Sequence, residues 1–446
     1  MLTTELDPYR PGYFDNPFAW TAGLRSTGQV LRDPRFGCSY VAGFDEARAV
    51  LHDKQRFSAR GQFLLTRLDE AVRRGARAFD PASVTATAPP SLSYLDPPLL
   101  NRTRRLLLPV FGSRAAATFG PTQLYERTIG AVATDHEIDV VSVASSLSRA
   151  VLADFLGLPA SSARVLADAL GPGDGSSAAD PTGRPSSRAL RSYTSSLCRD
   201  PGTSGVLAEL MALLAEAGIP ESQAVSVASE TALAVLVTSH QSLVRATVNL
   251  VRLLATRPDV WEDLRAGAAT AAAVVEEGLR LEGATLALGR QATEPTVVGS
   301  DEVPAGTLLV VLLGSANRDC RRFPQGDELD PSRADNGHLA FAAGPHLCMG
   351  AAMGRRHLGQ FLQAAAARWP AIRLAFEAHA RRDLLVRCFD RLVLLPPVHR
   401  SARHRRRAVP LADRRRRLRG SALAAPLRRF TPTAGTPASE SGSSTS

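Results

Sequence analysis

Apolar residues recur at helical spacing along most of the chain. Repeats at i, i+3 and i+4 place these residues on one face of a helix, which predicts amphipathic helices. The pattern occurs at 44–53, 141–158, 205–218, 221–256 and 271–282, and again after Cys348. Because several of these segments are long, they indicate a mainly α-helical fold.

Short strand-like stretches lie between the predicted helices. They fall at 30–42, 295–313 and 391–398, where apolar and β-branched residues are bounded by turn-forming residues. The sequence shows no internal repeat and no regular alternation of strands with helices. We therefore expect one large domain at 1–398, mainly α with a minor β-sheet region.

Two stretches lack clear periodicity. They are 59–93 and the Gly/Ser/Pro-rich 171–188. Long irregular segments inside a compact domain often serve as lids or binding loops. We therefore expect mobile loops here, and we expect 59–93 and 171–200 to shape a ligand pocket.

The formal net charge of +10 lies in the C-terminal tail. Residues 399–446 contain twelve arginines and two acidic residues, so the charges of 1–398 sum to zero. The tail carries RHRRR and RRRRLR and ends in a run rich in Ser, Thr and Pro, a composition that cannot bury enough apolar surface to fold. We expect a disordered tail and no binding of nucleic acid by the body.

Several broad protein classes do not fit the sequence. No apolar run reaches the length of a membrane span, and the N-terminus lacks the basic start and apolar stretch of a signal peptide. The five cysteines are widely spaced, odd in number and form no CxxC pair, which argues against a disulfide framework and a zinc site. We expect a soluble protein of a reducing, cytoplasmic compartment.

The stretch FAAGPHLCMG, 341–350, places Cys348 just before a predicted helix. The N-terminal end of a helix favours a thiolate, and Gly344 and Gly350 leave room for a large flat group. Cys348 has three interpretations: a buried inert thiol, a nucleophile, or a thiolate ligand of a metal cofactor. His346 is poorly placed to be the base of a nucleophile, so the ligand fits the glycines best.

This loop resembles the FxxGxHxCxG haem-binding loop of the cytochrome P450 family. The matching residues are Phe341, Gly344, His346, Cys348 and Gly350. Further motifs follow the family order: an ExxR pair at Glu277 and Arg280, then Arg290, ANRD at 316–319, FP at 323–324, DPSR at 330–333 and HLAF at 338–341. Upstream, 94–111 resembles the family's C-helix region, and 40–58 resembles its first sheet and B helix. The resemblance covers 7–398 and implies the cytochrome P450 fold.

The resemblance implies haem b with Cys348 as the proximal ligand. A thiolate ligand pushes electron density toward iron and favours O–O cleavage. The cofactor-binding residues that the resemblance implies are Cys348, His346, Arg104, Arg290, Phe341 and Gly350, of which His346, Arg104 and Arg290 match propionate partners. Glu277, Arg280 and Arg333 match a structural salt-bridge network. Leu100 replaces the family's usual propionate-binding histidine, so haem is expected to bind less tightly.

The family's oxygen-activation motif, Ala-Gly-x-Glu/Asp-Thr, falls on 238–242 of the long predicted helix. Gln241 stands in place of the acid and Ser242 in place of the threonine. Monooxygenation requires two protons delivered to dioxygen. Gln cannot titrate, whereas Ser can still donate a hydrogen bond or hold a water. We take Gln241 and Ser242 as the candidate catalytic residues and His240 as a packing residue.

The resemblance implies an oxidase or monooxygenase acting on a small organic, secondary-metabolite substrate. Electrons would come from NAD(P)H through a ferredoxin and a ferredoxin reductase, and the protein is expected to be a monomer. The missing acid favours oxidative coupling of aromatic substrates, with hydroxylation as the other reaction. A second class stays open, a haem-binding recruitment protein that has lost turnover, because both Gln241 and Leu100 depart from the family pattern.

Overall fold

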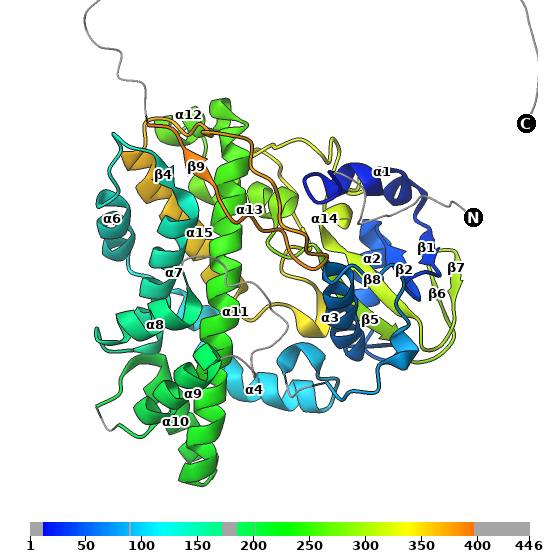
Figure 1. Ribbon diagram of the computed structural model, residues 1–446, viewed down its shortest axis with the longest axis horizontal. Coiled ribbons are helices and arrows are strands. Elements are labelled where there is room, and N and C mark those ends of the chain that lie inside the picture. The colour runs from blue at the N-terminus through cyan, green and yellow to red at the C-terminus, as the bar shows by residue number, and fades with distance from the viewer. Residues whose placement is uncertain (1–11, 89–90, 172–184, 201, 397–446) are drawn as a thin grey trace, which may run out of the picture. The chain divides into compact units, whose positions relative to one another are not determined.

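The computed structural model describes residues 12–88, 91–171, 185–200 and 202–396 (Figure 1). The predicted tail at 399–446 and the boundary at Val398 lie outside the described residues. The described helices are α1 (Pro17–Thr27), α2 (Phe44–His52), α3 (Arg60–Arg73), α4 (Leu99–Phe111), α5 (Ser113–Ala116), α6 (Thr122–Gly130), α7 (Val140–Leu156), α8 (Ser162–Leu170), α9 (Pro185–Cys198), α10 (Gly205–Glu216), α11 (Glu221–Ala255), α12 (Pro258–Ala266), α13 (Ala271–Glu282), α14 (Leu313–Ala316) and α15 (Ala351–Arg368). The mainly α-helical fold predicted from the sequence is confirmed.

The strands form one main sheet and two small ones. They are β1 (Val30–Asp33), β2 (Cys38–Val41), β3 (Phe57–Ser58), β4 (Ile138–Asp139), β5 (Ala287–Ala292), β6 (Thr296–Val298), β7 (Asp301–Val303), β8 (Leu308–Leu312) and β9 (Val393–Leu394). The five-stranded sheet has the order β1-β2-β8-β5-β3, in which β2 and β8 run parallel and the other pairs antiparallel. β4 pairs with β9, and β6 pairs with β7. The three strand-like stretches of the sequence therefore all contribute strands.

The helix α11, the long green helix of Figure 1, is the centre of the helical core. It spans 35 residues and packs against α7, α9, α13 and α15. Leu236, Leu250 and Leu254 on this helix are at most 2% exposed. Burying a leucine contributes roughly 1.5–3 kcal/mol relative to exposing it, so the tertiary contacts of α11 stabilise it far more than its local propensity does.

The main sheet is covered on both faces because its side chains alternate along β8. Leu308 and Val310 lie in one apolar cluster with α3, whereas Leu309 and Val311 lie in another with α2. Successive residues of a strand point to opposite faces, so the run LLVVL at Leu308–Leu312 serves both clusters.

The prediction that 59–93 is a mobile loop is wrong. Residues 60–73 form α3, whose Leu64, Leu65, Leu68 and Val72 are buried against the sheet. Gly61, near the start of this helix, allows a close approach: a Cβ there would lie 2.1 Å from the carbonyl carbon of Arg290. Of the second predicted loop, 172–184 lies outside the described residues, and α9 already begins at Pro185.

None of the helices in the described ranges is both long enough and apolar enough to cross a membrane.

Candidate active site

The loop that carries Cys348 is held by backbone contacts on both sides. Gly344 begins a short 3-10 turn, Gly344–His346, with a positive φ of 68°. A Cβ at this position would lie 2.5 Å from the carbonyl oxygen of Leu51, so only glycine lets the loop approach the end of α2 so closely. The amide of Cys348 donates to the carbonyl of Phe341 at 3.0 Å, and α15 starts at Ala351. The cysteine therefore precedes a helix, as predicted.

The side chain of Cys348 is exposed at the surface of this loop. Partial burial of its sulfur by the loop raises the pKa of the thiol. The backbone N–H of Gly350, which donates to the sulfur, and the guanidinium groups of Arg104 and Arg355 oppose that shift by lowering the pKa. Burial outweighs these groups in the free thiol, whereas one N–H donor and two cations beside the sulfur suit a thiolate that is bound to a metal.

Basic side chains from three segments gather around His346, two residues before Cys348. Arg290 of β5 is only 4% exposed, and burial lowers its pKa to about 10. Burial and the charges of Arg290 and Arg104 together lower the pKa of His346 to about 4, against the opposing charge of Asp96. Arg104 of α4 also has a lowered pKa, because it is partly buried. Two guanidinium groups whose charges disfavour a protonated His346 in this way favour an anionic ligand.

One polar atom of this cluster lacks a partner. Within the described residues, Nη2 of Arg290 is buried and has no hydrogen-bond acceptor. The neighbouring carboxylate, Asp96, favours the charged form of both Arg290 and His346, but it accepts from the amide of Ala59 at 2.8 Å and from the hydroxyl of Ser58. An unpaired buried N–H is costly, so Nη2 is well suited to a ligand carboxylate.

One face of the middle of α11 is exposed. Between Ala232 and Leu254 the exposed residues are Ala234, Thr238 and Ser242, spaced four apart and therefore on one face. Gln241 is buried. The ring of His240 is buried too, with Nδ1 at 3.2 Å from the hydroxyl of Ser148, which fits its interpretation as a packing residue. Of the two candidate catalytic residues, Ser242 alone is exposed on this face.

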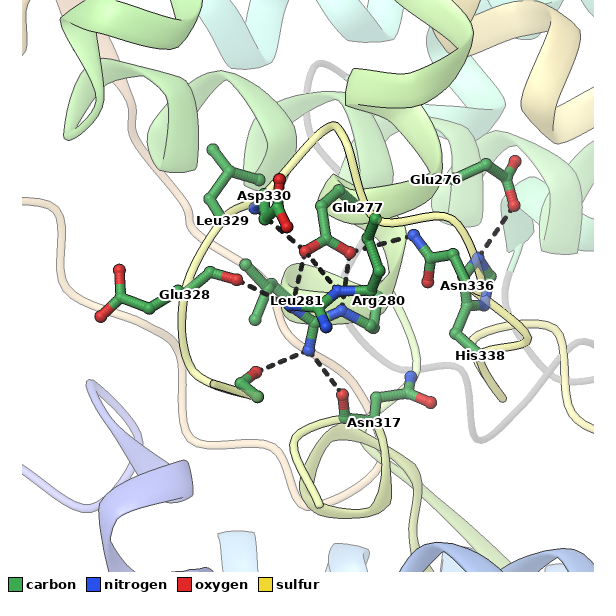
Figure 2. Close-up of polar contacts among 12 residues, drawn as sticks. Glu276, Glu277, Arg280, Leu281, Asn317, Glu328, Leu329, Asp330, Asn336 and His338 are labelled. Atoms are coloured by element: carbon green, nitrogen blue, oxygen red, sulfur yellow. Dashed lines mark hydrogen bonds and ion pairs between the residues drawn. The ribbon is translucent and has the colours of Figure 1, made fainter. Parts of the chain in front are cut away.

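Glu277 and Arg280 form a buried network instead of a reactive site (Figure 2). Nε and Nη2 of Arg280 donate to the two carboxylate oxygens of Glu277 at 2.7 and 2.8 Å. Arg280 also donates to the carbonyls of Asn317, Gly326 and Glu328. Arg333 donates to Glu277 at 3.1 Å, as the sequence motif implied. Because every strong donor and acceptor is used within the protein, the arrangement is structural.

Sequence reasoning missed the role of Arg355. Its guanidinium lies 4.6 Å from the ring centroid of Phe341, and it donates to Glu276 at 2.7 Å. Arg355 is the fifth residue of α15, seven residues after Cys348, and nothing in the haem-loop motif points to it. Leu100, in place of the expected histidine, is fully buried and adds no polar group to the site.

These features fit haem, which has two carboxylates at one edge and an iron that accepts an axial thiolate. Arg104, Arg290 and His346 would hold the carboxylates, and Cys348 would supply the thiolate. Phe341 and Gly350 complete the loop around that cysteine, through a backbone acceptor and an N–H donor respectively.

Known proteins similar to this chain are haem-thiolate proteins. The family description Cytochrome P450 matches residues 216–365. Nocardicin C N-oxygenase of Nocardia uniformis is 31% identical over 357 residues, which cover 76% of this chain and 83% of the relative. Cytochrome P450 monooxygenase PikC of Streptomyces venezuelae is 30% identical over 76% of this chain and 80% of its own length. The solved structure of CYP109Q5 from Chondromyces apiculatus superimposes with a TM-score of 0.73 at 24% identity and covers 88% of this chain and 98% of that one. The chain therefore belongs to the cytochrome P450 family of monooxygenases, whose cofactor is haem iron.

Proposed function

We propose that this protein oxidises a small aromatic secondary-metabolite substrate and that the reaction is oxidative coupling. The observation that carries the proposal is the pair Gln241 and Ser242 on α11. Ser242 is exposed on the open face of the helix, whereas Gln241, at the position where the family places an acid, is buried and cannot titrate.

Haem bound through Cys348 would supply dioxygen activation and one-electron oxidation of the substrate. The residues of the chain bind the cofactor and position water. Arg104 and Arg290 would hold the cofactor's carboxylates by charge, and His346, whose pKa is lowered to about 4, would donate a neutral N–H to them. The N–H of Gly350 donates to the sulfur of Cys348. The hydroxyl of Ser242 holds a water or donates one hydrogen bond at the exposed face of α11.

The missing acid changes which substrates suit this site. A substrate with its own acidic N–H or O–H can help to organise water next to Ser242. The same group is readily oxidised by loss of a hydrogen atom, which leaves a radical able to couple. Coupling two such groups removes two hydrogens, and dioxygen is reduced to two waters with two electrons from NAD(P)H and two protons. Hydroxylation consumes the same electrons and protons but leaves one oxygen in the product.

Similar proteins support this class of substrate and chemistry. PikC and nocardicin C N-oxygenase are secondary-metabolite enzymes among the relatives. A protein of similar fold, CxnD, forms a C–S bond in chuangxinmycin biosynthesis; it covers 89% of this chain with a TM-score of 0.69 at 24% identity. Fold likeness alone does not transfer a reaction, so Gln241 and Ser242 carry the argument here.

We further propose the remaining features of the working enzyme. A ferredoxin and a ferredoxin reductase deliver the electrons from NAD(P)H to a monomeric, cytoplasmic catalytic domain at 1–398. The arginine-rich segment 399–446 is a dispensable tail.

Isotope labelling tests the reaction. The purified holoprotein, a ferredoxin, its reductase and NADPH are incubated under ¹⁸O₂ with cyclodipeptides that contain tryptophan or tyrosine. We expect a product that has lost two hydrogens and carries no label. A main product with one labelled oxygen would overturn coupling in favour of hydroxylation. If a substrate shifts the haem spectrum but gives no product in a single turnover, the protein is instead a binding module without turnover.

A further inference from the structure

Two buried carboxylates from distant parts of the chain share one arginine. Asp69 of α3 lies 2.8 Å from Nη2 of Arg73, and Asp383, in the turn 383–386, lies 3.8 Å from Nη1 of the same guanidinium. The side chain of Asp69 is fully buried and that of Asp383 is 9% exposed. Buried acidic side chains are uncommon, and two beside one cation are rarer still.

The same carboxylates accept hydrogen bonds that hold the turn in shape and join it to α3. Oδ1 of Asp69 accepts from the amide of Leu384 at 2.8 Å, which joins the helix to the turn directly. Oδ1 of Asp383 accepts from the amides of Leu385 and Val386 at 2.9 and 3.0 Å, which holds the turn in shape. The charge state of this pair therefore acts on the junction between α3 and the turn.

Further charged groups face the pair from each neighbouring element. Arg245 of α11 is buried near Asp383 and favours its ionised form, and Glu70 of α3 disfavours ionisation of Asp69. Tyr13, from the N-terminal segment, lines one small cavity with Asp383, and burial raises the pKa of Tyr13 to about 12, so it stays neutral. Glu70 is itself paired with Arg67 at 2.9 Å, so Arg73 and Arg245 are the cations that face Asp69 and Asp383 in a largely dry environment.

The burial of Asp69 and Asp383 raises the pKa values of both carboxyl groups. Burial raises the pKa of Asp69 to about 7, and the charge of Asp383 adds to the shift. Burial also raises the pKa of Asp383, although Arg245 and Arg73 oppose the shift. Two carboxylates this close do not both ionise easily, so one proton belongs to the pair.

We propose that Asp69 and Asp383 form a proton-sharing latch that closes α3 onto the turn 383–386 and loosens when the shared proton leaves. The latch lies beside the candidate active site. Arg245, which faces Asp383, is one helical turn after Gln241, and the opposite end of α3 packs on the backbone of Arg290 through Gly61. Loosening therefore releases one end of a helix whose other end contacts the propionate-binding strand. The inference does not depend on which reaction the enzyme performs.

The sign of the effect follows from linkage. A carboxyl whose pKa is raised in the closed state stabilises that state below its ordinary pKa, and this stability is lost as pH rises through the raised value. In an open latch, Asp69 would regain an ordinary pKa near 4. Between pH 6 and pH 8.5 the closed state should therefore weaken by about tenfold.

Hydrogen–deuterium exchange of the full-length holoprotein measures this directly. We expect the protection of the amides of Leu384, Leu385 and Val386, corrected for intrinsic exchange at each pH, to fall about tenfold from pH 6 to pH 8.5. Asp69→Asn copies the protonated acid and keeps the acceptor for Leu384, so its protection should stay high and independent of pH. Asp168→Asn, which makes the same charge change on the exposed face of α8, should behave as the wild type does.

A second variant keeps the test valid if Asp69→Asn does not fold. Asp383→Asn removes the neighbouring charge, so Asp69 should ionise at lower pH and the change should move below pH 6. Protection in the wild type that does not vary with pH would overturn the latch. A pH dependence that persists unchanged in Asp69→Asn would also overturn the latch. If Asp69→Asn does not fold, the same result in Asp383→Asn would overturn it.

Discussion

Replacing Glu277 by glutamine tests whether the buried network of Figure 2 is structural. The carboxylate is fully buried and accepts five hydrogen bonds. Oε1 accepts from Arg280, Arg333 and the amide of Asp330, and Oε2 accepts from Arg280 and Asn336. The Glu277→Gln change preserves size and shape but removes the charge and one acceptor.

The size of the effect follows from these contacts. A glutamine keeps one oxygen, so its NH₂ group must face the donors that Oε2 now serves, Nε of Arg280 and the amide of Asn336. Losing two hydrogen bonds to a charged group costs about 1.5–3 kcal/mol each. Breaking a buried ion pair such as Glu277–Arg280 costs roughly 3–5 kcal/mol, and this figure counts the same contacts, so the two are not added. We expect the free energy of unfolding to fall by about 3–5 kcal/mol.

The assay is equilibrium urea unfolding followed by circular dichroism, with turnover per bound haem measured on the folded protein. Glu276→Gln is the matched control, because it makes the same change one residue earlier, where the side chain is 30% exposed and pairs with the exposed Arg355. That pair should contribute about 1 kcal/mol or less. The reasoning is refuted if Glu277→Gln costs less than about 1 kcal/mol, if the control costs as much, or if a stable variant loses turnover per haem.

Three further changes test the site. Cys348→Ala should abolish the thiolate–carbon monoxide absorption band while the circular dichroism of the helical fold remains, and a retained band would contradict the ligand assignment. Arg290→Gln should speed haem loss to an acceptor protein and weaken binding roughly tenfold to a hundredfold, because a charged partner of the carboxylates is lost; unchanged haem retention would count against the cation cluster. Gly61→Ala should destabilise the protein by about 1–3 kcal/mol, because its Cβ would meet the backbone of Arg290. Gly130→Ala is the control, because a Cβ there would meet no other atom and should not destabilise the protein. Equal melting temperatures of the two variants would argue against this contact.

The regions that sequence reasoning described well are those governed by local spacing. The helical periodicity of 271–282 coincides with α13, and that of 205–218 with α10 and the two residues after it. The FxxGxHxCxG motif placed Cys348 just before a helix, and α15 does begin at Ala351. In these cases the residue types and their separation carry the information.

The error at 59–93 has a specific physical origin. Gly61 and the polar residues of α3 resemble a loop when read locally. Its apolar residues Leu64, Leu65, Leu68 and Val72 become a helix face only because Leu308 and Val310, more than two hundred residues later, supply the surface that buries them. Helix formation that depends on distant packing is invisible to a local pattern.

The sequence by itself determined the mainly helical fold, the candidate ligand cysteine and the departure at Gln241, because each depends on residue type and short-range spacing. Only the tertiary structure decided which charges meet. Arg104 and Arg290 lie far from His346 in the chain, yet they converge on it and their charges lower its pKa. Asp69 and Asp383, separated by more than three hundred residues, share Arg73 in a buried site. Electrostatic interaction depends on distance through space and on burial, and neither follows from the order of residues.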